Sequence, residues 1–359
     1  MLSDAIDPLS IRRVLVVKLR HHGDVLLTSP VFSVLKRHIP HAELDALVYA
    51  DTADMLTGHP AISRVHSIDR AWKKHGPLQQ LRHEWHLLRQ LRARDYDLLV
   101  HLTESARGAA LAFLLGPRAA VARDYGEKRG RLWRTAFTHR YRVPAKPRHT
   151  VEIHLDALRR LGIYPGTDER ALTLVPGSDA ESSVRALLQA HSLAPKSFVH
   201  LHPTSRWLFK CWEPEKYAAL INTLQDSGER IVLTAAPSDE ELQFVGSITV
   251  QLRKPVINLS GKLSLKQLAA LTAQAKLFVG VDSVPMHIAA AMQTPAVALF
   301  GPSGDLEWGP WQVKSRVITS DHSCRPCGLD GCGNSKVSEC LTTLPVVSVL
   351  QAVTELLRP

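Results

Sequence analysis

Runs of apolar residues alternate with amphipathic segments in the first half of the chain. Three runs, at residues 14–19 (VLVVKL), 44–50 (LDALVYA) and 97–102 (DLLVHL), have the length and composition of buried strands. Between them apolar residues recur every three or four positions, most clearly over residues 28–38, which predicts helices. Strands that alternate with helices in this way predict an α/β fold with a doubly wound parallel sheet.

The same pattern starts again in the second half. Five strand-like runs lie at residues 198–202, 231–235, 256–259, 277–281 and 296–300, again with helical segments between them. A chain of 359 residues also exceeds the ~250 to 300 residues at which single cores stop growing. We therefore predict two Rossmann-like domains at 1–170 and 193–345, a linker at 171–192 and a final helix at 346–359. Two such sheets facing a central cleft would bind ligands at the carboxyl ends of their strands.

Composition narrows the class of protein. Hydrophobic residues make up 45% and charged residues 22%, which is typical of a folded globular chain. The first thirteen residues contain two Asp and one Pro and lack the apolar core of a secretory signal. No apolar run reaches the ~18 residues of a membrane span. These features predict a cytoplasmic protein that meets a membrane only at its surface.

The net charge of +10 favours anionic partners such as phospholipid, nucleic acid or phosphorylated glycans. Residues 123–142 are strongly basic with interleaved aromatics. This segment is either a solvated face or a patch that receives a phosphorylated glycan or lipid headgroups. Because no nucleic-acid-binding motif accompanies it, we predict no nucleic-acid partner.

The loop after the first strand, residues 20–24 (RHHGD), places Asp24 where the strand gives way to a helix. Such an aspartate lies at the ligand-binding edge of the sheet. The alternative is that it only caps the helix. The loop lacks the G-x-G-x-x-G pattern, which argues against a nicotinamide site.

In the second half, residues 280–287 (GVDSVPMH) join a strand to a helix. Ser283 suits the cap position and Pro285 the first turn. The free N–H groups at such a helix start bind phosphate, although the same pattern occurs in capped helices without a ligand. His287 faces either the ligand or the core.

The segment 202–212 (HPTSRWLFKCW) combines hydroxyl groups, two cations and aromatics. Lys210 or Arg206 could neutralise a diphosphate leaving group, or each could be an ordinary surface cation. Asp95 and Asp97 form a D-x-D that precedes its strand, so we interpret it as a turn.

Four cysteines, Cys324, Cys327, Cys332 and Cys340, follow each other closely. Their spacing is compatible with zinc but matches no standard pair of zinc knuckles. We predict a reduced structural loop and no metal site.

Three segments, 16–40, 203–212 and 278–303, together resemble the lipopolysaccharide heptosyltransferases of glycosyltransferase family 9, in the same order and separation. The resemblance covers about residues 12–311 and is greatest to members that add the branch heptose. It implies a GT-B arrangement, with an amino-terminal acceptor domain and a carboxy-terminal donor domain. It also implies inverting transfer from ADP-heptose to a heptose of the phosphorylated inner core, with no metal or other cofactor, at the cytoplasmic face of the inner membrane.

The resemblance assigns roles to single residues. Asp24 matches the general base, Lys210 the diphosphate-binding lysine, and Asp282, Ser283 and His287 the helix-opening donor motif. The family commonly has Thr and Gly where this chain has Ser283 and Val284. Further candidates are Thr204, Ser205 and Glu240 for the donor, and Arg20, His21, Arg129 and Arg131 for the acceptor.

Two other functions stay open at this point. One is a different nucleotide-sugar enzyme on the same fold, such as an epimerase or a transferase with another donor. The other is a binding module without catalysis that uses the basic segment.

Overall fold

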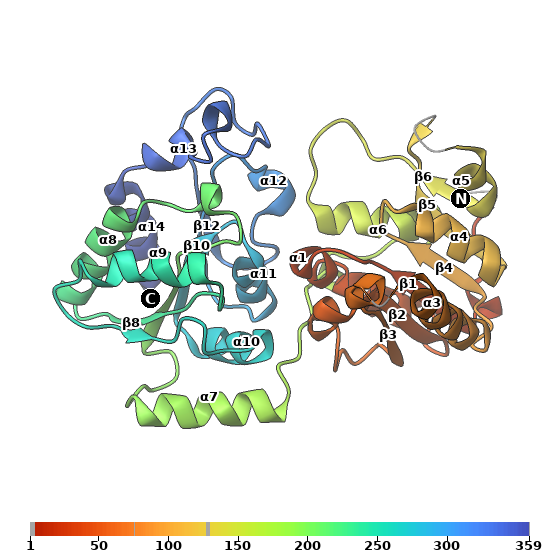
Figure 1. Ribbon diagram of the computed structural model, residues 1–359, viewed down its shortest axis with the longest axis horizontal. Helices are drawn as coiled ribbons and strands as arrows, with labels where there is room; N and C mark the ends of the chain where they lie inside the picture. The colour runs from red at the N-terminus through yellow and green to blue at the C-terminus, as the bar shows by residue number, and fades with distance from the viewer. Residues whose placement is uncertain (1–3, 75, 127–129, 359) are drawn as a thin grey trace. The chain divides into compact units, whose positions relative to one another are not determined.

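The computed structural model describes residues 4–74, 76–126 and 130–358 (Figure 1). The chain forms two compact units, Met1–Thr173 and Leu174–Pro359. Each unit contains one six-stranded sheet whose paired strands all run parallel. This confirms the predicted α/β class with two doubly wound parallel sheets.

The first unit has the strand order β3-β2-β1-β4-β5-β6, so the order in which strands are added reverses between β1 and β4. Its strands are β1 (Arg13–Val17), β2 (Glu43–Tyr49), β3 (Arg64–Ile68), β4 (Leu98–His101), β5 (Ala119–Arg123) and β6 (His139–Tyr141). Its α-helices are α1 (His22–Leu26), α2 (Ser29–His38), α3 (Pro77–Arg92), α4 (Ala106–Leu115), α5 (Arg131–Ala136) and α6 (Thr150–Arg160). Short 3-10 helices lie at Pro8–Ser10, Ala50–Met55, Arg70–Lys74 and Thr167–Glu169.

Helices α3, α4 and α5 share one hydrophobic core with the sheet of the first unit. Leu87 and Leu91 of α3, Ala112 of α4, Trp133 of α5 and Phe137 just after α5 are all buried in this cluster. The three helices therefore form one layer over a single face of the sheet, and their other sides point away from that core (Figure 1).

The second unit repeats the topology, with the order β12-β11-β10-β7-β8-β9 and the reversal between β7 and β10. Its strands are β7 (Phe198–His202), β8 (Arg230–Leu233), β9 (Ile257–Asn258), β10 (Leu277–Val281), β11 (Ala296–Leu299) and β12 (Ser315–Ile318). Its α-helices are α7 (Ser178–Ala190), α8 (Pro214–Asp226), α9 (Asp239–Thr249), α10 (Leu265–Gln274), α11 (Val284–Ala291), α12 (Asp305–Trp308), α13 (Glu339–Thr342) and α14 (Val346–Leu357). Short 3-10 helices lie at Leu208–Lys210 and Cys332–Asn334.

The segment 171–192, which we expected to be a linker, contains the whole of α7. Ala180, Val184 and Leu188 of this helix are buried in a core cluster with residues of α10. Because these contacts are internal to the second unit, the helix belongs to that unit and the boundary lies at residues 173–174. The helix at the end of the chain, α14, also packs within the second unit through Val349 and Val353.

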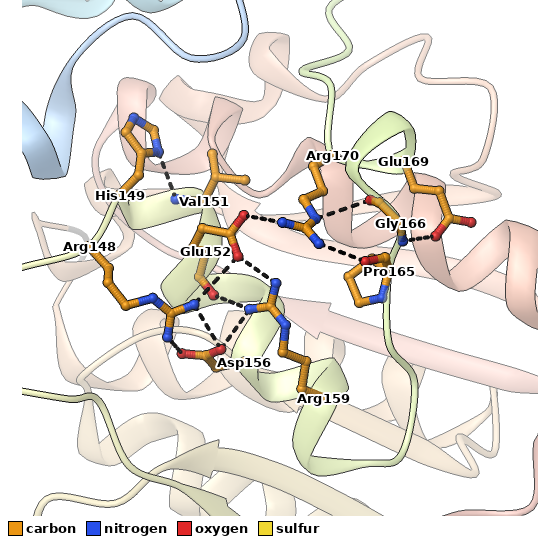
Figure 2. A network of polar contacts seen from close by, with 10 residues as sticks. All are labelled: Arg148, His149, Val151, Glu152, Asp156, Arg159, Pro165, Gly166, Glu169 and Arg170. Carbon is orange, nitrogen blue, oxygen red and sulfur yellow. Dashed lines mark hydrogen bonds and ion pairs between the residues drawn. The ribbon is translucent and has the colours of Figure 1, made fainter.

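A network of ion pairs holds α6 in the first unit (Figure 2). Glu152 pairs with Arg148, Arg159 and Arg170, and Asp156 pairs with Arg148 and Arg159. The Arg170–Glu152 and Arg148–Asp156 contacts measure 2.9 and 2.8 Å. These pairs link α6 to the segments just before and after it, at Arg148 and Arg170.

Candidate active site

Polar side chains gather in each sheet at the point where the strand order reverses. In open α/β sheets, ligands bind at the carboxyl ends of the strands at this point. Asp24 follows β1 in the first unit, while Lys210 follows β7 and Asp282 follows β10 in the second. The predicted catalytic and diphosphate-binding residues therefore lie where each fold places its ligands.

The Asp24 carboxylate is held from two directions. Lys18 Nζ lies 3.1 Å from Oδ1, and the backbone N–H of His21 donates to Oδ2 at 2.9 Å. The second contact is part of a capping box in which His21 occupies the cap position and Asp24 the third position of the helix, so Asp24 supports the helix start without being the cap residue that the simpler interpretation expected. It is nevertheless partly accessible, with 23% of its side chain exposed. Capping and access to a substrate therefore coexist in this residue.

Lys18 also contacts His154, which α6 supplies from a distant part of the sequence. Lys18 Nζ lies 3.3 Å from His154 Nε2, and His154 Nδ1 lies 3.2 Å from the carbonyl oxygen of Leu27. Because a carbonyl can only accept, Nδ1 carries the proton and Nε2 accepts from Lys18. Burial together with the Lys18 charge lowers the pKa of His154 to about 3. The histidine is therefore neutral and can accept the hydrogen bond from the Lys18 ammonium.

These contacts set the protonation state of Asp24. Burial alone would raise the pKa of the carboxyl, but the Lys18 charge and the His21 N–H outweigh it and hold the pKa below its usual range. Asp24 is therefore ionised at neutral pH, which is the state that a general base requires. Sequence patterns gave no signal for Lys18 or His154, since neither role is visible without the packing of α6.

The proposed acceptor residues are spread over the first unit. Arg20 is exposed, and His21 is half-buried with its Nδ1 3.8 Å from Asp24 Oδ2. Arg131 is exposed at the start of α5. Arg129 lies outside the described residues. The basic segment 123–142 is not one surface, because it spans the end of β5, α5 and β6 and buries Trp133.

In the second unit, Lys210 and Asp282 form a close ion pair. Lys210 Nζ lies 2.6 Å from Asp282 Oδ2, and the two side chains are only 18% and 9% exposed. The same ammonium lies 5.1 Å from the centroid of the Trp207 ring. The loop after β7 and the end of β10 thus bring an ion pair to the point where the strand order of this sheet reverses.

The start of α11 lies directly after Asp282. Ser283 occupies the cap position and Pro285 the first turn, as predicted. The Ser283 hydroxyl donates to the carbonyl of Val281 at 3.4 Å and makes no cap hydrogen bond to the helix. The hydroxyl therefore does not bind the N–H groups at the start of the helix, which are the groups that bind an anion. His287 lies one turn in and is 4% exposed.

A buried carboxylate follows the second strand of this sheet, but it is Glu241 and not Glu240. Thr204 Oγ1 donates to Glu241 Oε2 at 2.6 Å, and the backbone N–H of Ala236 donates to the same oxygen at 3.2 Å. Glu240 is exposed. The helical spacing could have found this residue, since positions 241, 245 and 248 form the buried face of α9.

Behind Thr204 lies a buried chain of hydroxyl and imidazole groups. His202 Nδ1 and His200 Nε2 lie 2.8 and 2.7 Å from the Thr234 hydroxyl. Ser205 shapes the adjoining loop, since its N–H donates to Cys211 Sγ at 3.3 Å. These contacts hold the loop that carries Thr204 in one conformation.

A cavity of about 220 Å³ adjoins Lys210. Its lining combines three short segments of the second unit: Trp207, Phe209, Lys210, Pro302, Ser303, Gly328, Leu329 and Asp330. Gly328–Asp330 belong to the loop that carries the cysteines. Two contacts tie this loop down: the Gly328 N–H donates to the Pro302 carbonyl at 2.9 Å and the Ser338 hydroxyl to the Phe209 carbonyl at 2.6 Å.

All five cysteines are free. Within the described part of the chain, no three His, Cys, Asp or Glu side chains form a group that could hold a metal ion. Asp97 has a structural role, since its carboxylate accepts from the N–H groups of Arg12 and Arg13. Among residues 4–74, 76–126 and 130–358, no helix is long and apolar enough to cross a membrane.

The chain is similar in sequence to known heptosyltransferases. The model of glycosyltransferase family 9 (heptosyltransferase) matches residues 84–338. Lipopolysaccharide heptosyltransferase 3 of Escherichia coli is 37% identical over 294 residues, which cover 82% of this chain and 84% of the relative. Lipopolysaccharide heptosyltransferase 1 of Pseudomonas aeruginosa is 29% identical over 320 residues, which cover 88% and 86%.

Solved structures show the same fold. The glycosyltransferase of family 9 from Veillonella parvula aligns with a TM-score of 0.83 and 23% identity over 99% of both chains. The E. coli heptosyltransferase WaaC with ADP aligns with a TM-score of 0.71 and 23% identity over 96% of this chain and 99% of the other. With its two doubly wound sheets and this extent of sequence similarity, the chain belongs to glycosyltransferase family 9, the heptosyltransferases.

Proposed function

We propose that this enzyme transfers heptose from ADP-heptose to a heptose of the lipopolysaccharide inner core and adds the branch heptose. One structural observation carries the assignment of the donor site: the Lys210–Asp282 ion pair lies directly before the start of α11. An ammonium beside a helix amino terminus suits a diphosphate. The similarity to lipopolysaccharide heptosyltransferase 3 supports the identity of the sugar.

The proposed reaction is an inverting displacement. A hydroxyl oxygen of the acceptor attacks the anomeric carbon of the donor, and the bond from that carbon to the diphosphate oxygen breaks. The bonding electrons leave with ADP, and the proton of the hydroxyl passes to the Asp24 carboxylate. An ionised Asp24 is ready to take this proton.

Lys210 is the group that stabilises the leaving diphosphate. Negative charge grows on the diphosphate as the bond breaks, and a positive charge fixed in advance stabilises that state at no cost in reorganisation. Asp282 holds the ammonium in place at 2.6 Å. In this proposal the protein itself supplies the charge, and no metal ion or other cofactor takes part.

The remaining donor contacts are assigned to the buried polar groups behind Lys210. Glu241 and Thr204, which hydrogen-bond to each other, are assigned to the sugar hydroxyls, and Ser205, Ser283 and His287 of the same unit are the remaining candidates. The cavity of about 220 Å³ is smaller than the ~300 to 1,000 Å³ of whole-ligand pockets. It therefore suits one moiety of the donor.

The acceptor and the cellular location complete the proposal. Phosphate groups of the inner core would meet the cations of the first unit, including Arg20, His21 and Arg131. Because that acceptor is attached to lipid, we propose that the enzyme works at the cytoplasmic face of the inner membrane as a peripheral protein.

The test is mass-resolved transfer from ADP-heptose to purified inner-core acceptors that differ by one heptose, with and without a chelator. The proposal expects a gain of one heptose on the acceptor that lacks the branch, unchanged by the chelator. No transfer to any core would overturn the proposal, and transfer that stops with the chelator would overturn its metal-free form.

The other enzyme considered from the sequence is a nucleotide-sugar enzyme with a different donor or an epimerase activity. Incubation with UDP-sugars in the same assay distinguishes this alternative from the proposed function, because such an enzyme would convert UDP-sugars without any acceptor present. Family membership argues against this alternative.

A further inference from the structure

Helix α3 exposes large apolar side chains on its outer face. Leu78, Leu81 and Trp85 are 83%, 67% and 59% exposed. They are spaced by three and four residues, so they lie along one side of the helix. The core contacts of α3 come from Leu87 and Leu91 instead. The exposed residues are therefore not the ones that hold the helix on the sheet.

The same outer face continues as a row of arginines. Arg82, Arg89 and Arg92 follow the spacing of Leu78, Leu81 and Trp85, and all three are exposed. For these arginines the described residues provide no ion-pair partner. The face thus combines apolar side chains in the first half of the helix with positive charge that begins among them at Arg82 and continues to Arg92.

Neighbouring helices extend this surface. The Arg107–Glu84 ion pair joins α4 to α3, and α4 packs against α5 in the same layer. Phe113 and Leu114 of α4 and Leu132 of α5 are 69%, 43% and 55% exposed. We call the surface that the exposed apolar residues of these three helices form the outer layer surface. Its residues are Leu78, Leu81, Trp85, Phe113, Leu114 and Leu132.

Positive charge is concentrated in the part of the sequence that contains these three helices. Residues 64–148, which include all three helices, contain 19 Lys and Arg against 7 Asp and Glu. The rest of the chain contains 25 Lys and Arg against 27 Asp and Glu. The whole net positive charge of the protein therefore comes from the part of the sequence that carries the outer layer surface.

We propose that the outer layer surface docks on an anionic lipid bilayer, with the α3 apolar residues in the headgroup region and the arginines on lipid phosphates. Helices that bind in the plane of a membrane have this composition, with Trp and Leu beside basic residues. Basic residues near the bilayer add attraction to anionic lipids, and Trp favours the interface. This inference deepens the proposed function, because a lipid-linked acceptor lies in such a bilayer.

Vesicle co-sedimentation of the full chain tests the proposal. The probes are phosphatidylcholine vesicles with and without 30 mol% phosphatidylglycerol, a composition chosen for about one anionic lipid in three. Wild-type protein is expected to sediment with the anionic vesicles and lose binding at high salt. The double variants Leu81→Ser/Trp85→Ser and Arg82→Glu/Arg89→Glu are each expected to weaken binding by at least about tenfold.

The matched control is Val250→Ser/Arg185→Glu, which changes an exposed apolar residue and an exposed arginine of the second unit. It should bind vesicles like wild type. Equal binding of all variants, or equal binding to neutral vesicles, would overturn the proposal. A concentration-dependent dimer in ultracentrifugation that only the α3 variants abolish would also overturn the proposal, because the outer layer surface would then bind a second copy of the chain.

Transfer to a delipidated core oligosaccharide separates this inference from the proposed function. The α3 variants should keep wild-type transfer to this lipid-free acceptor while losing vesicle binding. Vesicle binding by a wild-type protein that transfers no heptose would overturn the proposed function alone. Transfer without any vesicle binding would overturn the docking proposal alone.

Discussion

Lys210 Nζ lies 2.6 Å from Asp282 Oδ2, so the ammonium is already oriented before a diphosphate arrives. The two residues are 72 positions apart and meet only because β7 and β10 are neighbours in the sheet. A cation held in this way loses little side-chain entropy when it binds a ligand. In the proposed reaction the pair is thus a preorganised contact for the leaving group.

We expect Lys210→Met to reduce kcat/KM by about 100-fold or more, because one charged hydrogen bond in the transition state contributes roughly 3 kcal/mol. Lys210→Arg should recover part of the loss, since it restores the charge with a different shape. Steady-state kinetics with ADP-heptose and calorimetric binding of ADP measure both effects. If Lys210→Met keeps wild-type kcat/KM, the diphosphate assignment is wrong.

Replacing Asp24 with Asn should leave ADP-heptose binding within about twofold and lower kcat by about 100-fold to 10,000-fold, the usual contribution of a general base. The amide is similar in size and can still accept the His21 N–H, so the loop should keep its shape. Donor binding by calorimetry is the control. Unchanged turnover would exclude Asp24 as the base.

The pH dependence of kcat/KM should report the Lys18 contact. Asp24 must be ionised to act as a base, so activity falls as the pH drops through its pKa, which Lys18 holds below the usual range. In Lys18→Met the burial of Asp24 is no longer opposed by this charge, and its pKa rises. The acid limb of the profile should therefore move to higher pH in the variant. An acid limb at the wild-type position would show that Lys18 does not control this group.

Two neighbouring glutamates form a matched pair for a test of donor binding. Glu241→Gln should weaken ADP-heptose binding by about tenfold and cost about 1 to 3 kcal/mol of stability, because Thr204 and Ala236 both donate to this buried carboxylate. Glu240→Gln changes an exposed residue and should have neither effect. Calorimetry and thermal unfolding of both variants provide the comparison, and equal behaviour of the two would refute the role of Glu241.

Stability should decrease on mild acidification. Burial lowers the pKa of His200 and of His202 to about 3, against an ordinary value of 6.5. Below pH 6.5 the unfolded chain binds protons that the folded protein does not, so the free energy of unfolding falls as pH drops from about 6.5 toward 3. The expected loss is roughly 1 kcal/mol per pH unit for each histidine. Thermal unfolding at pH 7.5 and 5.5 measures it, and an unchanged Tm would contradict the buried neutral state.

The central strands could be predicted from the sequence because β1, β4, β7 and β10 are buried at nearly every position and consist mostly of apolar residues. Strands β3, β6 and β12 lie at sheet edges, include exposed or polar residues and gave no such signal. Strand β5 consists largely of alanine and was missed for lack of β-branched residues. The hydrophobic pattern therefore found the strands that position the candidate site, and also the edge strand β9, but it missed the other three edge strands and β5.

For the candidate site, the same distinction holds. Asp24, Lys210 and Asp282 directly follow central strands or lie in the first loop after them, so strand prediction was enough to find them. His154 comes from a helix 136 residues after Lys18, and only tertiary packing brings the two together. A local sequence pattern carries no information about such a pair.

The cavity beside Lys210 has a consequence for biosynthesis. Its lining includes Trp207, Ser303 and Asp330, so its last wall is translated more than a hundred codons after its first. The first unit ends at Thr173 and can fold while the ribosome is still making the second. In the proposed reaction, a nascent chain would then hold Asp24 long before the proposed donor site is complete. Ribosome-bound intermediates would therefore not bind the proposed donor until synthesis is almost finished.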